Sequence, residues 1–169
     1  YKVSGKNFKD LFVEYTPNFE VKSGSVYMNM KFANTSQTVQ VIRAEDGQVY
    51  NCSGNFTNLR LPVGNYVVPT LEAGGLQCIK LLGTNGEGDF DFKSNFDMST
   101  VSNINHLAFN CRLFNGNIAH FDFSNVVNAK KAFQHCSAFN NDIGGGWYMP
   151  KATDVNEMFA SCSKFNQPI

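Results

Sequence analysis

The sequence has few charged residues and no excess of either sign. Of its 169 residues, 17% are charged, and 14 Lys and Arg balance 14 Asp and Glu to give a formal net charge of +0. Globular proteins average about 25% charged residues. Proteins that bind nucleic acid or anionic membranes through general electrostatics carry a basic surplus, so this balance excludes nucleic acid and charged membrane surfaces as partners.

Long hydrophobic runs are also missing. No stretch approaches the roughly 18 consecutive apolar residues of a transmembrane helix, and the N-terminal YKVSGKNFKD lacks the apolar core of a secretory signal peptide. We therefore expect no membrane span. The chain is instead rich in Phe (16) and Gly (14), and with so few charges its surface must consist largely of Asn, Ser, Thr and Gln. Such a composition is typical of extracellular β-rich or repeat proteins.

The first half of the chain has the pattern of short antiparallel strands. Alternating or β-branched runs predict strands at residues 26–32, 39–42, 49–50, 56–61, 66–68 and 76–82. The Asp46-Gly47 pair predicts a hairpin turn, and the segment 62–65 predicts another. This spacing favours a small antiparallel β-sandwich over residues 18–84. Residues 1–17 have Phe and Leu at helix-like spacing and are expected to form an N-terminal docking segment.

The second half repeats itself at intervals of 25 and then 26 residues. Four groups of residues coincide under these shifts: Phe96, Phe121 and Trp147; Cys111, Cys136 and Cys162; Phe114, Phe139 and Phe165; and Ile118, Ile143 and Ile169. A period of 20 to 50 residues is the signature of a repeat solenoid, in which each copy forms one coil. We expect about three coils over residues 85–169.

Each copy has the pattern of one strand and one short helix. Val126, Ala129, Ala132 and Phe133 have the spacing of the inward face of a helix, and residues 152–159 repeat it. The segment 118–123 alternates like a strand, and such strands would stack at about 4.8 Å into a parallel sheet. The sequence therefore predicts an α/β repeat solenoid preceded by a small antiparallel β-sandwich.

The repeat resembles that of a known family. The run Phe139-Asn140-Asn141-Asp142-Ile143 and the later segment NEMFASCSKFNQPI, residues 156–169, are similar to the BspA-like surface-protein repeat, a relative of the leucine-rich repeat. The resemblance covers residues 89–169 and implies leucine-rich-repeat-like coils in a surface protein that binds other proteins. Two departures are Tyr148, where the family has an acidic residue, and Ala108, where it has Phe.

The two N-terminal parts have weaker resemblances. Residues 55–83 are similar to the end of the β-sandwich that precedes the coils in many proteins of that family. The opening YKVSGKNFKDLFVEY resembles the short N-terminal segments of some bacteriophage virion proteins, which implies docking to a neighbouring chain.

The cysteines do not have the spacing of a shared metal site. On rungs about 4.8 Å apart, the thiols of Cys111 and Cys162 would lie about 10 Å apart, whereas one zinc ion binds its sulfurs at about 2.3 Å. The sequence favours a buried row of thiols, with a disulfide between adjacent rungs as the alternative. Cys52 and Cys78 could pair in an oxidising compartment.

No catalytic or cofactor motif is present. His106, His120 and His135 do not share a repeat position and have no nucleophile at a recognisable spacing. Residues 144–146 are glycines, but no Lys or Ser/Thr completes a phosphate loop. Four residues with side-chain oxygens alternate in one loop: Asn85, Glu87, Asp89 and Asp91. This pattern could indicate a calcium site, but the glycine and the last glutamate of an EF-hand are absent. The sequence favours a solvated linker over calcium binding here. We expect no enzyme activity, no cofactor and no metal.

The exposed side chains of the coils remain as candidates for function. We predict a partner-binding face that includes His120, Asp122 and Tyr148, because stacked repeats present an extended surface. The expected function is a non-enzymatic protein-binding or adhesion module at the cell surface or outside the cell, with a protein or host-surface ligand. The alternative is a structural component of a bacteriophage virion, contacting neighbouring virion chains or further copies of itself. The end of the last coil is expected to be covered, by further repeats or by another chain.

Overall fold

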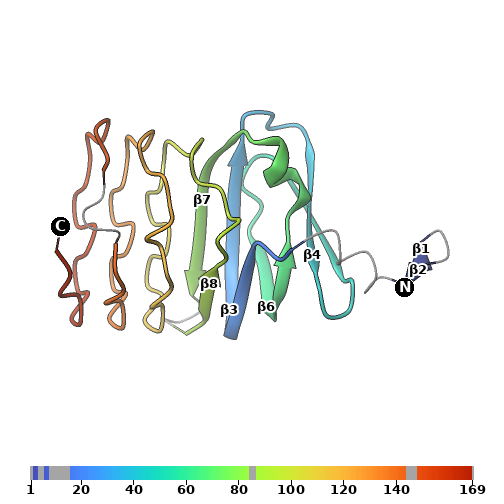
Figure 1. Cartoon of the computed structure of the whole chain (residues 1–169), viewed down its shortest axis with the longest axis horizontal. Coiled ribbons are helices and arrows are strands. Elements are labelled where there is room, and N and C mark those ends of the chain that lie inside the picture. Colours follow the sequence, from blue (N-terminus) through green and yellow to red (C-terminus); the bar gives the residue numbers. More distant parts are fainter. Residues whose placement is uncertain (1, 4–5, 8–15, 84–86, 144–147, 169) are drawn as a thin grey trace.

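The centre of the molecule is one open antiparallel sheet. The structure is a computed structural model of the chain and describes residues 2–3, 6–7, 16–83, 87–143 and 148–168. Figure 1 shows a series of stacked turns next to one side of the sheet. Its strands are β3 (Phe19–Phe32), β4 (Thr38–Arg43), β5 (Val49–Ser53), β6 (Leu59–Val67), β7 (Leu76–Gly83) and β8 (Asp89–Phe92). The order in space is β5-β4-β6-β3-β7, and β8 also pairs with β3.

β3 organises the sheet because both of its edges are paired. Val26, Met28 and Met30 alternate along it with less buried residues and point into the core. One edge of β3 pairs with β6. The other edge is divided, since residues 26–32 pair with β7 and residues 19–23 pair with β8. β7 and β8 together therefore form the side of the sheet on which the rest of the chain stacks.

Three further elements are short. β1 (Lys2–Val3) and β2 (Lys6–Asn7) form an antiparallel pair, and η1 (Pro69–Ala73) is a 3₁₀ helix between β6 and β7. The expected N-terminal docking segment falls mostly on residues 8–15, which lie outside the described residues. Within the described ranges, no helix has the length and apolar character needed to span a membrane.

After β8 the chain forms three stacked loops, here called the turn stack. Rung 1 covers residues 93–117, rung 2 residues 118–143 and rung 3 residues 148–168. Backbone hydrogen bonds join the rungs at the interval of the sequence repeat: the N–H of Ile104 donates to the carbonyl of Asn128 (2.8 Å), and the N–H of Ala129 donates to that of Asp154 (2.8 Å). Each rung thus satisfies backbone groups of its neighbour.

The turn stack continues the sheet beyond β7. Isolated parallel bridges connect Cys78 to Asn103, Asn103 to Asn128, and Asn128 to Asp154. Rungs 1 to 3 lie side by side beyond β7 in Figure 1. One edge of the sheet is therefore covered by backbone, which removes the exposed edge that would otherwise invite pairing with other chains.

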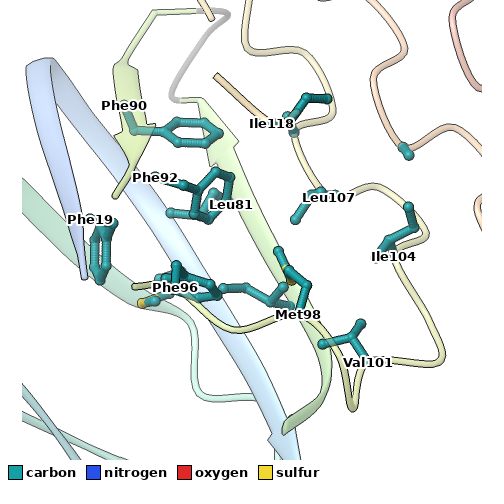
Figure 2. Close-up of a cluster of buried hydrophobic side chains, with 14 of the residues drawn as sticks. Phe19, Leu81, Phe90, Phe92, Phe96, Met98, Val101, Ile104, Leu107 and Ile118 are labelled. Carbon is teal, nitrogen blue, oxygen red and sulfur yellow. The ribbon is translucent and has the colours of Figure 1, made fainter. Parts of the chain in front are cut away.

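Phenylalanine rings fill the interior from the sheet to rung 3. Phe90 stacks on Phe114 with ring centroids 4.6 Å apart, Phe114 on Phe139 at 5.6 Å, and Phe139 on Phe165 at 5.6 Å. Figure 2 shows Phe90 with Phe19 and other side chains where the sheet meets rung 1. Buried side chains of sheet and stack form one hydrophobic cluster, so the two parts share a core.

The prediction of an α/β repeat solenoid preceded by a β-sandwich is wrong. The described residues contain one six-stranded open antiparallel sheet, the small β1–β2 pair, one 3₁₀ helix and no α-helix. In place of the expected helix, Asn128 forms isolated bridges and residues 130–133 form turns, and residues 118–123 form no strand. The leucine-rich-repeat-like coil of strand and helix is therefore not the unit of this fold.

The backbone of each rung explains why no helix forms. Lys131 has φ +56° and His135 has φ +64°, in the left-handed region that an α-helix cannot include. The N–H of Lys131 donates to the carbonyl of Asn156 in the next rung (2.9 Å) instead of to a carbonyl four residues earlier. Val126 and Ala129 are nevertheless fully buried, because successive turns place every third or fourth residue inward as a helix does.

Most of the strands predicted in the first half are confirmed, but their arrangement in a two-sheet sandwich is not. The runs at 26–32, 39–42, 49–50 and 76–82 lie within β3, β4, β5 and β7. The turn expected at residues 62–65 is wrong, because these residues lie inside β6, which continues from Leu59 to Val67. A sandwich needs two packed sheets, whereas here the turn stack supplies much of the surface that buries the core.

Candidate functional site

The predicted partner-binding residues lie at or next to one repeated position of the turn stack. Asp122 and Tyr148 occupy equivalent positions in rungs 2 and 3, and Asp97 occupies the same position in rung 1. We call Asp97, Asp122, Tyr148 and the neighbouring His120 the partner row. Asp122 and His120 are exposed, and Tyr148 is 74% exposed. The sequence prediction omitted Asp97, although the repeat interval alone identifies it.

Local hydrogen bonds hold the carboxylates of this row in place. Asp97 accepts the backbone N–H of Ser99 (2.8 Å), and Asp122 accepts that of Ser124 (2.9 Å). These are Asx turns, in which a side chain caps its own backbone. Hydrogen bonds from the side chain and backbone of Ser124 lower the pKa of Asp122, so this residue presents a negative charge at neutral pH.

A small polar cavity adjoins the first member of the row. This junction cavity, about 190 Å³ in volume, lies between the start of β3, η1 and the start of rung 1. Asp97 and Glu72 contribute carboxylates to its wall, Asn18 and Asn95 contribute amides, and Pro69 and Leu71 form an apolar side. Polar side chains from β3, η1 and rung 1 thus meet around one open cavity.

Asn18 connects the three elements around the cavity. Its Oδ1 accepts the N–H of Val68 (2.8 Å), its backbone N–H donates to Tyr66 (2.8 Å), and its carbonyl accepts the N–H of Lys93 (2.9 Å). The residue is only 8% exposed.

The repeated cysteines form a buried row of thiols. Each Sγ donates to a carbonyl of the preceding layer: Cys111 to Leu81 (3.2 Å), Cys136 to Ala108 (3.0 Å) and Cys162 to Phe133 (2.8 Å). All five cysteines are free, so neither the disulfide between rungs nor the pair Cys52 and Cys78 is formed. The row fixes the packing of one rung on the next.

These thiols should resist alkylation in the native protein. Burial raises the pKa of Cys111 to about 12 and also raises that of Cys136, and only the thiolate is a nucleophile. With iodoacetamide at pH 8, we expect mass spectrometry to find Cys111 and Cys136 unmodified in the native chain and all five cysteines modified in urea. Modification of either residue at equal rates in both conditions would contradict the buried row.

The three histidines contact aromatic rings, and two of them contact the same ring. His120 packs on Phe121 (4.4 Å between ring centroids), whereas His106 and His135 contact Phe109 at 5.0 and 6.0 Å. Within the part of the chain that the structure describes, no three His, Cys, Asp or Glu side chains are placed to hold a metal ion. Asn85 of the calcium alternative and the glycines 144–146 lie outside the described residues.

A second charged area lies on β7 and on the side of the rungs that continues β7 through the bridges of Asn103, Asn128 and Asp154. Burial, together with the positive charges of Lys80, Lys131 and Lys130, lowers the pKa of His106. Lys131 also forms an ion pair with Glu157 (3.8 Å), and Asp154 belongs to the same run. Because charges of both signs occur here, this area provides matched control positions for tests of the partner row.

The end face of rung 3 is partly open in this single chain. Val155 is 52% exposed, whereas Ile104 and Ala129, at the equivalent positions in rungs 1 and 2, are fully buried. The expectation that another segment or chain covers this face stays a prediction.

Comparison with known proteins identifies the second half of the chain. The family described as "Mycoplasma protein of unknown function, DUF285" matches residues 84–169, just over half of the sequence. No match was found among the curated proteins or the solved structures.

Proposed function

Since the chain belongs to the DUF285 family, a group defined without a known function, we propose a function from its own surface: a non-enzymatic binding or adhesion module. The partner row makes the contact. The module acts at the cell surface or outside the cell, and its ligand is a protein or another component of a host surface.

The observation that carries this proposal is the placement of the partner row on a stiff backbone. Asp97, Asp122 and Tyr148 repeat at one position of three rungs whose backbones are hydrogen-bonded to each other. Exposed loop side chains on a rigid scaffold are the usual means of recognition in proteins. Rigid side chains also lose less conformational entropy when a partner binds, which favours affinity.

The composition of the row supports a protein or cell-surface partner. Tyr148 combines a large apolar ring with a hydroxyl group, and tyrosine is enriched where binding energy concentrates. The neighbouring carboxylate of Asp122 adds a fixed charge, and His120 adds an imidazole that rests on Phe121. The resemblance to BspA-like surface proteins also favours a location outside the cell.

Binding to intact cells tests this function. The fluorescently labelled chain is added to cultured animal epithelial cells and measured by flow cytometry. The row variant carries His120→Asn, Asp122→Asn and Tyr148→Ser. We expect it to lose about tenfold or more in binding, since truncating an anchor residue in an interface costs about 2 kcal/mol or more.

A control variant makes three comparable substitutions on the run that continues β7, with an exposed valine in place of the tyrosine. It carries His135→Asn, Asp154→Asn and Val155→Ser, and it should bind as well as the unmodified chain. Equal losses in both variants would contradict the partner row. A chain that binds no cells and is recovered from its native source only within phage particles would contradict adhesion and support the virion component.

A further inference from the structure

The backbone hydrogen bonds between rungs run in one direction. In rung 1 the N–H groups of Ile104 and His106 donate to carbonyls of rung 2 (2.8 and 3.1 Å), and in rung 2 those of Ala129 and Lys131 donate to carbonyls of rung 3 (2.8 and 2.9 Å). The carbonyls of these four donor residues are bonded within their own turns. Along this run, each rung therefore presents donors to the rung that follows it.

The end face of rung 3, the outermost layer of the stack in Figure 1, presents the same donors. Val155, Glu157 and Ser161 occupy the positions of three donor residues of rung 2. Within the described residues their N–H groups have no hydrogen-bond partner, and the carbonyls of Val155 and Glu157 are again bonded within their own turn. A row of unpaired backbone groups is a template for pairing with another chain. Here the partner must supply carbonyls.

Two acceptors accompany the row of donors. The carbonyl of Val127 accepts two N–H groups of rung 3 (2.8 and 3.4 Å), and the carbonyl of Thr153 is its counterpart on the end face. The Oδ1 of Asn140 accepts the N–H of Asn166 (2.7 Å), and Asn166 presents the equivalent amide. The end face therefore repeats the hydrogen-bonding pattern by which rung 2 holds rung 3.

This pattern argues against two kinds of occupant. Along the edge of an ordinary β-strand, N–H and carbonyl groups alternate, so the N–H groups of such a strand would meet the donors of this face. A second copy of the same face, related by a twofold axis, would place donors opposite donors. It would also bring the two Glu157 carboxylates together, and like charges directly opposite each other are destabilising.

The repeat itself has the carbonyls that this face needs. Those of Asn128, Lys130 and Gln134 accept N–H groups of rung 1 at 2.8, 3.1 and 2.9 Å. We propose that the end face of rung 3 binds a segment of the same repeat in another protein, which adds its backbone as a further rung. This second binding surface goes beyond the proposed function, because backbone groups outside the partner row form it. Val155→Ser in the control variant above keeps its N–H group.

The side chains of the end face determine what the bound segment must carry. Phe165 is only partly buried and stacks on Phe139 of rung 2 (5.6 Å between centroids), so its other side can take a further aromatic ring. Val155 is 52% exposed and requires an apolar cover. Glu157 pairs with Lys131 of rung 2 (3.8 Å), so a basic residue opposite Glu157 is favoured.

A synthetic peptide with the sequence of residues 126–140, VVNAKKAFQHCSAFN, tests the proposal on the full chain. This segment already covers an equivalent face of rung 1, and it carries a lysine at the position opposite Glu157. NMR of the labelled chain measures how fast each amide exchanges with water. We expect exchange at Val155, Glu157 and Ser161 to slow about tenfold once about nine-tenths of the chain has bound peptide, since a protected amide exchanges from its open state.

Two altered peptides are the controls, and they leave the chain itself unchanged. A scrambled peptide of the same composition should slow none of these amides. A peptide with Lys131→Glu should bind about threefold more weakly, because a surface charge pair contributes little but a like charge is unfavourable.

Three outcomes would overturn the proposal. They are unchanged exchange at millimolar peptide, equal slowing by the scrambled peptide, and slowing at these amides when the chain alone is concentrated. The last outcome would make a second copy of the chain the occupant. Loss of peptide binding with intact binding to cells would leave the partner row standing, whereas peptide binding without cell binding would contradict the proposed function alone.

Discussion

Replacing Phe139 by alanine should lower the free energy of unfolding by roughly 3–5 kcal/mol. The ring of Phe139 is fully buried and stacks between Phe114 and Phe165, with centroids 5.6 Å away on each side. Removing it leaves a cavity in the middle of the turn stack, where the backbone of three hydrogen-bonded rungs limits collapse. Urea unfolding, followed by far-ultraviolet circular dichroism, measures the decrease in the free energy of unfolding.

Phe165→Ala is the matched control for this prediction. Phe165 occupies the same repeat position in rung 3 but is only partly buried, so its loss should cost clearly less than that of Phe139. Because sheet and stack share one hydrophobic cluster, we expect a single unfolding transition in both variants. Equal costs for the two positions, or a separate early transition of the stack, would contradict the shared core.

Among substitutions that add a single methyl group near the junction of sheet and turn stack, Gly88→Ala should lower the stability most. Gly88 has φ +103°, and an added Cβ would lie 2.5 Å from the backbone carbonyl oxygen of Ser25. The left-handed backbone costs a non-glycine residue about 1–2 kcal/mol, and crowding in a packed site adds about 1–3 kcal/mol. The expected result is a fall in the melting temperature, measured by differential scanning calorimetry.

Gly74→Ala separates the two causes. Gly74 has φ +74°, but no atom lies within 4 Å of the position of an added Cβ. This variant should therefore show the backbone cost alone, and Gly88→Ala should be less stable than it. Identical melting temperatures for the two variants would show that Ser25 is not in the close contact described.

The strands could be predicted from the sequence because their signals are local. β-Branched runs and the Asp46-Gly47 turn are sufficient for β4 and β5, whose hairpin is closed around Gly47 at φ +75°. β6 was divided incorrectly, since Pro62 and Gly64 indicate a turn when read alone. In the structure Pro62 pairs with Ser25 and Gly64 with Val21 across an irregularity of β3, and this pairing depends on a distant strand.

The helix prediction was wrong because the spacing of apolar residues in the repeat fits two different structures. Apolar residues at intervals of three and four indicate a helix, but the same intervals arise when successive turns each place one residue inward. Lys131 and His135 decide between them through positive φ angles. Neither residue type signals a left-handed backbone as glycine does, so the hydrogen bonds to the next rung determine the outcome.

The candidate site was predictable only in part. Asp122 and Tyr148 follow from the repeat, with His120 next to them, and Asp97 would have followed by the same reasoning. The junction cavity could not be predicted, because Asn18 and Glu72 are 79 and 25 residues from Asp97 and meet it only after β3, η1 and rung 1 have packed.

The central claim is that the repeat forms rungs joined by backbone hydrogen bonds to the next copy. Scalar couplings across hydrogen bonds, measured by NMR on the labelled chain, test it directly. The structure predicts couplings from the amide nitrogens of Ala129 and Lys131 to the carbonyl carbons of Asp154 and Asn156. Couplings instead from residues 130–133 to the carbonyls four residues earlier would show a helix and contradict the account.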